Sequence, residues 1–163
     1  MKKILIILVL LLLVSCNNNN RQENSNNERY TYLIELINEH EEFLSDSTYF
    51  DIAVEMAKIS DGYRYYVTVD NPRLAMYDVE LLAIEKNVDY SSRMAANIGI
   101  FEDTQYNIVP NQANPSKGYV KGVVASGVTN LPNTTLYIFV QFKNADYTTN
   151  HVEYFKIDVS YEG

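Results

Sequence analysis

The sequence is poor in the residues that most often carry chemistry: its 163 residues include one cysteine, two histidines and no tryptophan. A single cysteine excludes an intrachain disulfide and a zinc site built from several thiolates. We therefore expect the stability of the fold to come from a hydrophobic core alone. Hydrophobic residues make up 47% of the chain, which is enough for such a core, and the length is typical of one domain.

Positive charge is also scarce. The chain has 13 basic and 21 acidic residues and a net charge of −8, and without Lys2 and Lys3 the remainder carries a net charge of −10. A surface that binds nucleic acid needs clustered lysine and arginine side chains. No such cluster occurs, so we expect no nucleic-acid partner.

The first sixteen residues carry the clearest motif. Lys2-Lys3 precede an unbroken apolar run from Ile4 to Val14. This run is shorter than the about 20 residues of a membrane-spanning helix and has the length of a secretion signal's hydrophobic region. It ends in Leu13-Val14-Ser15-Cys16, which resembles the lipobox of bacterial lipoproteins. The resemblance implies that a diacylglyceryl group alkylates the Cys16 thiol and that a peptidase cleaves between Ser15 and Cys16.

We therefore expect residues 1–15 to be a signal peptide and residues 16–28 to be the lipidated cysteine and a disordered, Asn-rich tether. Residues 17–28 include no apolar side chain, and such a stretch cannot bury surface to offset its ordering entropy. Two acyl chains hold a protein firmly on a bilayer. The predicted location is the extracytoplasmic face of the cell membrane, and the Lys/Asn/Ile/Tyr-rich composition favours a Gram-positive host.

A single globular domain is predicted over residues 29–163, beginning with a helix. Residues 29–44 place apolar side chains at helical spacing, and the acidic side chains lie mostly off this stripe. The stripe consists of Leu33, Leu36, Ile37, His40, Phe43 and Leu44. We expect the stripe to pack against the rest of the domain, with docking of a partner helix as the alternative.

The next segment, residues 49–59, fits both a helix and a strand. Asp61-Gly62 favours the strand, because this dipeptide is typical of a two-residue hairpin turn. Such a turn would place Met56 opposite Val67 and Val54 opposite Val69, with Glu55 and Thr68 on the other face. A shift by one residue would destroy this match, so we predict a strand in this register.

Further strands are predicted over residues 63–69, 76–84, 94–101, 106–109, 119–128, 134–142 and 152–161, separated by turn residues. Seven or eight strands without alternating helices indicate a mainly β fold, an antiparallel β-sandwich over residues 49–161. This region resembles the immunoglobulin-like domains of small bacterial lipoproteins. The resemblance is architectural, lacks the Cys…Trp…Cys signature of antibody-type domains and implies no functional residue.

Catalysis has little support in the sequence. A serine–histidine–acid triad would have to use His40 or His151, and no Gly-x-Ser-x-Gly elbow presents a serine. Carboxylate pairs of the kind that glycosidases use arise by chance among 21 acidic residues. We expect no catalytic residue and no cofactor, with a small envelope enzyme as the remote alternative.

Two further groups of residues could bind a ligand. Asp70, Asn71, Asp89, Asp103 and Asn107 lie in or near predicted loops, and calcium prefers such oxygen ligands. Turn formation accounts for the same residues, so we predict no metal site and keep calcium as the alternative. Tyr63, Tyr65 and Tyr66 could form a stacking platform, but strand alternation sends Tyr65 and Tyr66 to opposite faces.

These features predict a membrane-anchored extracytoplasmic lipoprotein that acts as a non-catalytic binding or interaction module. Its partners would be the membrane, through the lipid on Cys16, and a protein or glycan. The alternative is an accessory subunit of a membrane-embedded secretion, conjugation or envelope complex, in which the tether supplies a high effective concentration.

Overall fold

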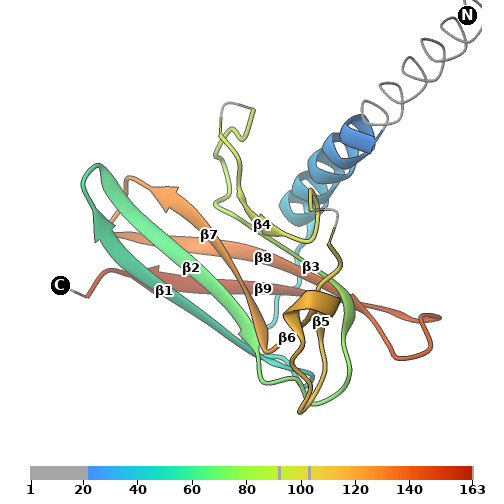
Figure 1. Ribbon diagram of the computed structural model, residues 1–163. Coiled ribbons are helices and arrows are strands. Elements are labelled where there is room, and N and C mark those ends of the chain that lie inside the picture. Colours follow the sequence, from blue (N-terminus) through green and yellow to red (C-terminus); the bar gives the residue numbers. More distant parts are fainter. Residues whose placement is uncertain (1–21, 92, 103, 163) are drawn as a thin grey trace, which may run out of the picture.

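The computed structural model describes residues 22–91, 93–102 and 104–162, and it is mainly β (Figure 1). The predicted signal peptide, the lipobox and Cys16 lie outside the described residues. Within the described ranges, no helix has the length and apolar character needed to cross a bilayer. The prediction of a mainly β fold with antiparallel sheets and one N-terminal helix is confirmed.

The strands form two larger sheets and one small one. Their bounds are β1 (Asp51–Ile59), β2 (Gly62–Asp70), β3 (Tyr77–Ile84), β4 (Ala96–Ile98), β5 (Asn107–Ile108), β6 (Tyr119–Val120), β7 (Gly122–Thr129), β8 (Asn133–Lys143) and β9 (Asn150–Ser160), with a 3-10 turn at Pro115–Lys117. The antiparallel sheets have the orders β1-β2-β7 and β4-β3-β8-β9. The short pair β5-β6 is parallel, which the sequence did not predict.

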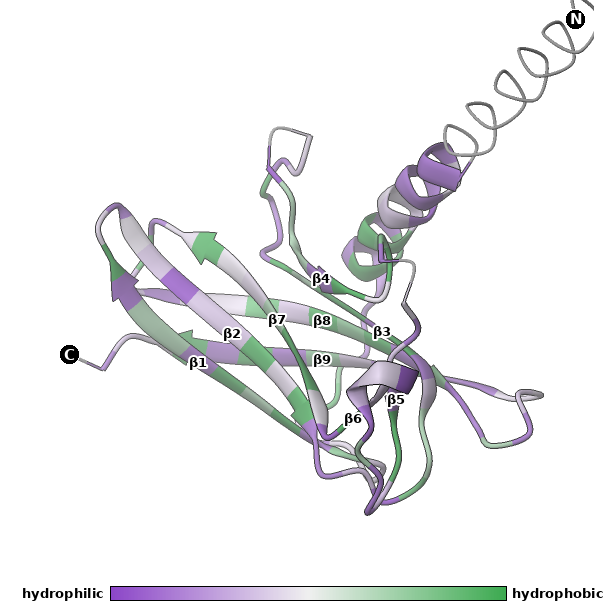
Figure 2. Cartoon of the chain, in the orientation of Figure 1, coloured by the Kyte–Doolittle hydropathy of each residue, from purple (hydrophilic) through white to green (hydrophobic). Residues whose placement is uncertain are grey.

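The core lies between the two antiparallel sheets. Alternate side chains point inward from each strand, as the period of two predicts, and Figure 2 shows the resulting hydrophobic bands. The inward set includes Tyr65, Val67 and Val69 of β2, Val123 and Ala125 of β7, and Leu136, Ile138, Val140 and Phe142 of β8. All of these residues are buried. Burial of each large side chain stabilises the fold by about 1.5–3 kcal/mol.

The N-terminal helix, residues 22–39, packs with its C-terminal half on the outer face of the four-stranded sheet, and its first turns project away from the domain (Figure 1). Its buried stripe of Tyr30, Leu33 and Ile37 packs with side chains of the sheet and the β4 region, namely Leu82, Ile84, Ala95, Ile100 and Phe139. The expected packing of the helix against the domain is confirmed. The central strand β8 is therefore buried on both faces, as its continuous apolar sequence predicts.

The helix bounds differ from the prediction at both ends. Residues 22–28, predicted to be irregular tether, are helical and largely exposed. They continue a helix that the packed stripe after residue 29 stabilises, so they need no apolar surface of their own. At the other end, the helix stops at residue 39 rather than 44, because the chain turns to meet β9. There Leu44 N–H donates to Tyr154 O (2.8 Å), and Lys156 N–H donates to Leu44 O (3.3 Å).

The first hairpin contains the predicted strand, but its register is displaced by two residues. Val54 lies opposite Val67, and Met56 lies opposite Tyr65. The loop consists of Ser60 and Asp61, and Gly62 begins β2 instead of occupying the turn. Gly62 has φ +136°, and a Cβ there would lie 2.7 Å from Thr129 O, so glycine is needed where β7 approaches. A shift of two leaves every side chain on its predicted face.

Other strand bounds differ by smaller amounts. The predicted strand 119–128 is divided at Lys121 into β6 and β7, which belong to different sheets. The predicted strands 94–101 and 106–109 shorten to β4 and β5. The loop between β4 and β5 lines the candidate site described below. The apolar residues predicted to extend these two strands therefore lie in or beside that loop.

A buried carboxylate joins β3, β7 and β8 at one end of the sheets. Glu85 is 6% exposed, and its Oε1 accepts hydrogen bonds from the Thr129 and Thr134 hydroxyls, both at 2.8 Å. Its Oε2 accepts from Arg93 Nη2 at 2.7 Å. Arg93 also donates to Val128 O at 3.0 Å. The carboxylate is thus fully bonded, as a buried charge must be.

Candidate functional site

The candidate site begins at a bulge in β3. Tyr77 lies opposite Lys143 and Glu80 lies opposite Gln141, so β3 has one more residue than β8 over this interval. The extra length falls at Asp78, whose φ of +50° lies in the left-handed region. Aspartate tolerates this conformation better than most residues. Bulges are frequent beside functional sites because they redirect a side chain out of the regular alternation.

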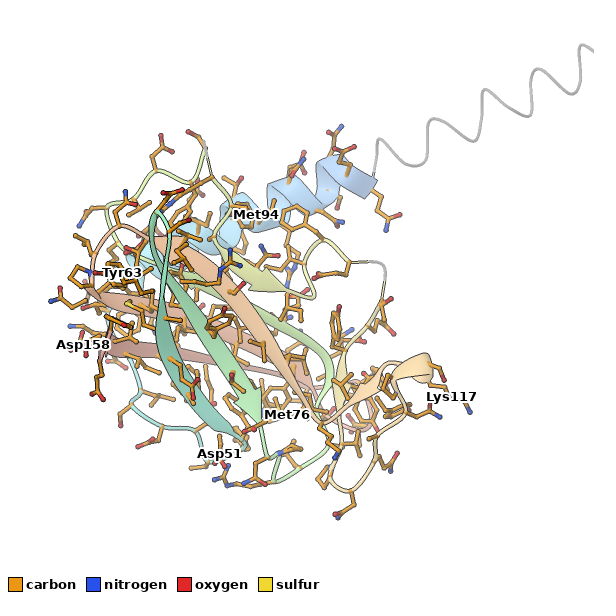
Figure 3. The ribbon with its side chains drawn as sticks, turned by 60° about the vertical axis from the view of Figure 1, so that its left-hand side comes forward. Asp51, Tyr63, Met76, Met94, Lys117 and Asp158 are labelled. Carbon is orange, nitrogen blue, oxygen red and sulfur yellow. The ribbon has the colours of Figure 1, made fainter. Side chains whose placement is uncertain are left out.

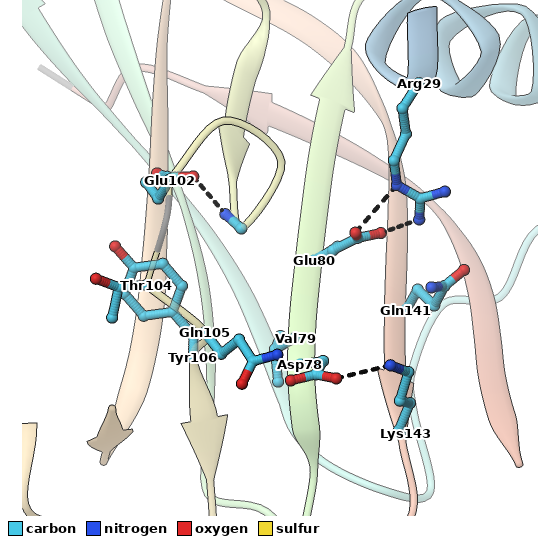
Figure 4. A pocket seen from close by; sticks show the side chains of 11 residues that line it. Arg29, Asp78, Val79, Glu80, Glu102, Thr104, Gln105, Tyr106, Gln141 and Lys143 are labelled. Carbon is cyan, nitrogen blue, oxygen red and sulfur yellow. Dashed lines mark hydrogen bonds and ion pairs between the residues drawn. The ribbon is translucent and has the colours of Figure 1, made fainter. Parts of the chain in front are cut away.

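A cleft of about 400 Å³ opens beside this bulge. Figure 4 shows its walls: the bulge of β3, Gln141 and Lys143 of β8, the loop that follows β4, and Arg29 of the helix. Gly99 permits the close approach of that loop. It has φ +79°, and a Cβ at this position would lie 2.3 Å from Val79 O. Only glycine therefore brings the loop against the bulge without displacement.

Asp78 has an unusual set of partners. Its backbone N–H donates to Asn107 Oδ1 at 3.1 Å, and its Oδ2 accepts from Lys143 Nζ at 2.7 Å. Its Oδ1 is buried and has no hydrogen-bond partner among the described residues, although the whole side chain is 17% exposed. Buried polar atoms are nearly always bonded. Asp78 Oδ1 is therefore an unpaired acceptor beside the cleft, and a ligand would reach it only after a movement of the wall that covers it.

The second carboxylate of the cleft is tied to the helix. Arg29 Nε donates to Glu80 Oε1 at 3.0 Å, and Arg29 Nη2 donates to Glu80 Oε2 (Figure 4). This two-point contact fixes the orientation of both side chains. It also neutralises Glu80 at the mouth of the cleft.

The remaining lining is polar. Glu102 Oε2 accepts a hydrogen bond from Gly99 N–H at 2.8 Å. The side chains of Thr104, Gln105 and Gln141 line the cleft, and they make no hydrogen bond with any described residue. Amide and hydroxyl groups both donate and accept. With two ion pairs already formed, the arrangement suits hydrogen-bonded recognition of a polar ligand.

The two histidines are not brought together. His40 stacks on Tyr154, with ring centroids 3.7 Å apart, and also contacts Phe43. His151 stacks on Phe142, with centroids 4.9 Å apart. Neither histidine lines the cleft. Both therefore pack as aromatic rings on the four-stranded sheet.

The residues considered for calcium serve local structure. Asn71 Nδ2 donates to Asp51 Oδ2 at 2.7 Å, and Asp89 Oδ1 accepts from Ser91 N–H at 2.8 Å, which lowers the pKa of Asp89. Asn107 supports the β3 bulge, and Asp70 lies opposite Gly122. Asp103 lies outside the described residues. Over the described ranges, no group of three or more His, Cys, Asp or Glu side chains is placed to hold a metal ion.

The three tyrosines of β2 do not form one platform. Tyr65 is buried, and burial strongly raises the pKa of its hydroxyl. Tyr66 is 37% exposed on the opposite face, as alternation predicts. Tyr63 packs on Tyr161, with ring centroids 5.5 Å apart. Strand packing therefore explains Tyr63 and Tyr65.

Sequence reasoning missed the residues of the cleft, although one signal pointed to the bulge. Met76 and Val79 are both fully buried in the same core. Their spacing of three breaks the period of two that a regular strand requires, and an extra residue between them resolves the conflict.

The chemistry of the cleft is inferred from its own residues. Comparison of the chain with protein-family models, curated proteins and solved structures found no significant match.

Proposed function

We propose that the protein is a lipid-anchored, extracytoplasmic lipoprotein whose domain is a non-catalytic binding module. The anchor is supported by the lipobox Leu13-Val14-Ser15-Cys16 at the end of the apolar run. The cleft beside Asp78 is the proposed ligand site. The observation that carries this assignment is the buried, unpaired Asp78 Oδ1 at its wall.

We place the domain in the immunoglobulin-like class of β-sandwiches. The strand orders β1-β2-β7 and β4-β3-β8-β9 support this assignment. They correspond to strands A-B-E in one sheet and C′-C-F-G in the other, which is the arrangement of such domains. Domains of this class present loops and sheet surfaces to partners on a stable core, which suits a binding role.

The ligand that the cleft fits is polar and carries at least one hydrogen-bond donor. Its donor would bond to Asp78 Oδ1, and a hydrogen bond to a charged group contributes about 1.5–3 kcal/mol. Gln105, Gln141 and Thr104 would hold further hydroxyl or amide groups. Hydroxyl-rich glycans and peptides both meet this description. The ion pairs are present without ligand, so the reorganisation that opposes binding would be confined to the wall that covers Asp78 Oδ1.

The proposed anchor would keep the domain near the membrane. Cys16 precedes the first described helical residue, Gln22, by six residues. Six residues span at most about 20 Å, and the exposed helical residues 22–28 add about 10 Å, which together is shorter than the extended tether that composition alone predicts. A ligand of the cell envelope would therefore meet the domain at high effective concentration.

Substitution of Asp78 by asparagine is expected to weaken binding of the cleft ligand roughly tenfold or more. The asparagine oxygen would turn to Lys143, and the amide N–H groups would then face the ligand's donor. Arrays of bacterial glycans and peptides, probed with labelled wild type and D78N, would identify the ligand, and calorimetry would measure the change. Gln112→Ala is the control, because Gln112 is exposed and lies outside the cleft. If every captured ligand binds D78N as well as wild type, the cleft is not the site.

Replacement of Cys16 by alanine is expected to abolish metabolic labelling with fatty acid and to leave an unprocessed precursor. Alanine has no thiol for alkylation, and cleavage follows lipidation. Ser15→Ala is the matched control, because it keeps a small residue before the cysteine and should still be labelled. Equal labelling of wild type and C16A would contradict the anchor.

A further inference from the structure

The sheet β1-β2-β7 has a free edge at β1. Ile59 and Gly62 close the two-residue loop of the hairpin as a hydrogen-bonded pair, and Val128, which lies opposite Arg64, directs its carbonyl outward to Arg93. The backbone groups of Arg64 therefore face β1, because an antiparallel ladder alternates its bonded pairs. Arg64 lies opposite Ala57, so Ala57 bonds to β2 and its neighbour Met56 points its N–H and C=O outward. The same alternation turns the backbone groups of Ile52, Val54 and Lys58 outward.

Nothing among the described residues occupies this edge. No other described segment forms a backbone hydrogen bond with the outward edge of β1. By contrast, Leu44 pairs with the edge of β9, and Arg93 caps Val128 on the edge of β7. β1 has no proline, and its nine residues pair with β2 without a bulge, so its edge protection is limited to charged side chains such as Glu55 and Lys58.

A second cleft, of about 480 Å³, lies along this edge. It is lined by Val54, Glu55 and Met56 of β1 and by Asp158, Val159, Ser160 and Glu162 at the end of β9. Figure 3 shows β1, which begins at Asp51, at the margin of the domain, and Asp158 on the same side. Val54 and Met56 are half-buried and offer apolar contact. The charged residues that line the cleft are three carboxylates and no cation.

We propose that the edge of β1 binds an extended segment of a partner protein that carries lysine or arginine at alternate positions. The segment would add a fourth strand to the sheet β1-β2-β7, with backbone bonds to Val54 and Met56. Its apolar residues would contact these two side chains, and its basic residues would meet the carboxylates of Glu55, Asp158 and Glu162. A second copy of this chain fits less well, because it too is strongly acidic.

The test uses the full-length lipidated chain in detergent and a capped nine-residue peptide of alternating lysine and valine, the length of β1. Fluorescence anisotropy should detect binding, and hydrogen exchange should show new protection at the Val54 and Met56 N–H groups. The same peptide N-methylated on every second residue separates the two edges of the strand. Methylation of the peptide N–H groups that face β1 should weaken binding by about tenfold for each lost hydrogen bond. Methylation of the other N–H groups, which face away from β1, should leave binding unchanged.

Protein variants provide the matched comparison. Met56→Pro removes an outward N–H without removing a bond to β2, as proline allows on an edge strand, and should weaken peptide binding about tenfold. Met56→Leu keeps the N–H and a similar volume and should bind as wild type. Glu55→Gln with Asp158→Asn should weaken binding and reduce its dependence on salt.

Three results would overturn the proposal. The first is no binding of the lysine–valine peptide at millimolar concentration. The second is equal binding of a glutamate–valine peptide, which would exclude recognition by charge. The third is protection of β1 that rises with protein concentration in the absence of peptide, which would identify a second copy of the chain as the occupant. None of these results depends on the cleft at Asp78.

Discussion

Replacing Glu85 with alanine is expected to lower the free energy of unfolding by about 1–3 kcal/mol, because buried and half-buried hydroxyl groups lose their charged acceptor. The substitution leaves the Arg93 guanidinium without its carboxylate and the hydroxyls of Thr129 and Thr134 without their acceptor. These groups come from three separate segments, so a single change releases the end of both larger sheets. Urea denaturation at neutral pH would measure the loss.

Two controls separate this effect from a general loss of negative charge. Glu41→Ala removes an exposed carboxylate and should change stability by less than about 0.5 kcal/mol. Glu85→Gln keeps an acceptor for the two threonines and should cost less than E85A. If E85A and E41A unfold at the same urea concentration, the network contributes nothing to stability.

Replacing Phe139 with alanine is expected to cost about 3–5 kcal/mol and to release the N-terminal helix. Phe139 is buried on the outer face of β8, in the cluster that includes Leu33 and Ile37 of the helix. The cavity left by the ring would remove the surface on which the helix packs, and an isolated helix of this length is marginal in water. Hydrogen exchange at the helix amides and far-ultraviolet circular dichroism would report the release.

Phe142→Ala is a matched control on the same strand. Phe142 is also fully buried, but it faces the core between the two sheets and contacts Phe50 and Tyr49. Its loss should lower global stability by a similar amount while the helix keeps its protection until the sheets unfold. Equal helix exchange in the two variants would show that the helix does not depend on Phe139.

Much of the fold could be predicted because side-chain alternation is local. The inward faces of β2, β3 and β8 follow directly from the period of two, and the stripe Leu33–Ile37 identifies the helix. The hairpin register could not be fixed in the same way. A shift of two residues preserves the faces, and the close approach of Thr129 to Gly62 is a contact between distant segments that alternation does not reveal.

The candidate site was less predictable because its contacts join distant segments. Arg29 and Glu80 are 51 residues apart, and Asp78 and Lys143 are 65 apart. Each side chain alone is typical of a solvated surface. Their meeting depends on the bulge at Asp78 and on the loop that Gly99 brings against it. By contrast, the lipidation motif can be read directly from the sequence, because it consists of four consecutive residues.

The ion pair between Arg29 and Glu80 also contributes to the way in which the domain would transmit mechanical load. Arg29 lies on the helix that leads to the proposed anchor, and the same side chain lines the cleft beside Asp78. Tension between a bound ligand and the membrane would thus pass from the helix into β3 and β8 through the Arg29–Glu80 ion pair and through the apolar cluster that includes Phe139. The sheet β1-β2-β7 lies outside this path, so its free edge would remain unstrained while the cleft is under tension.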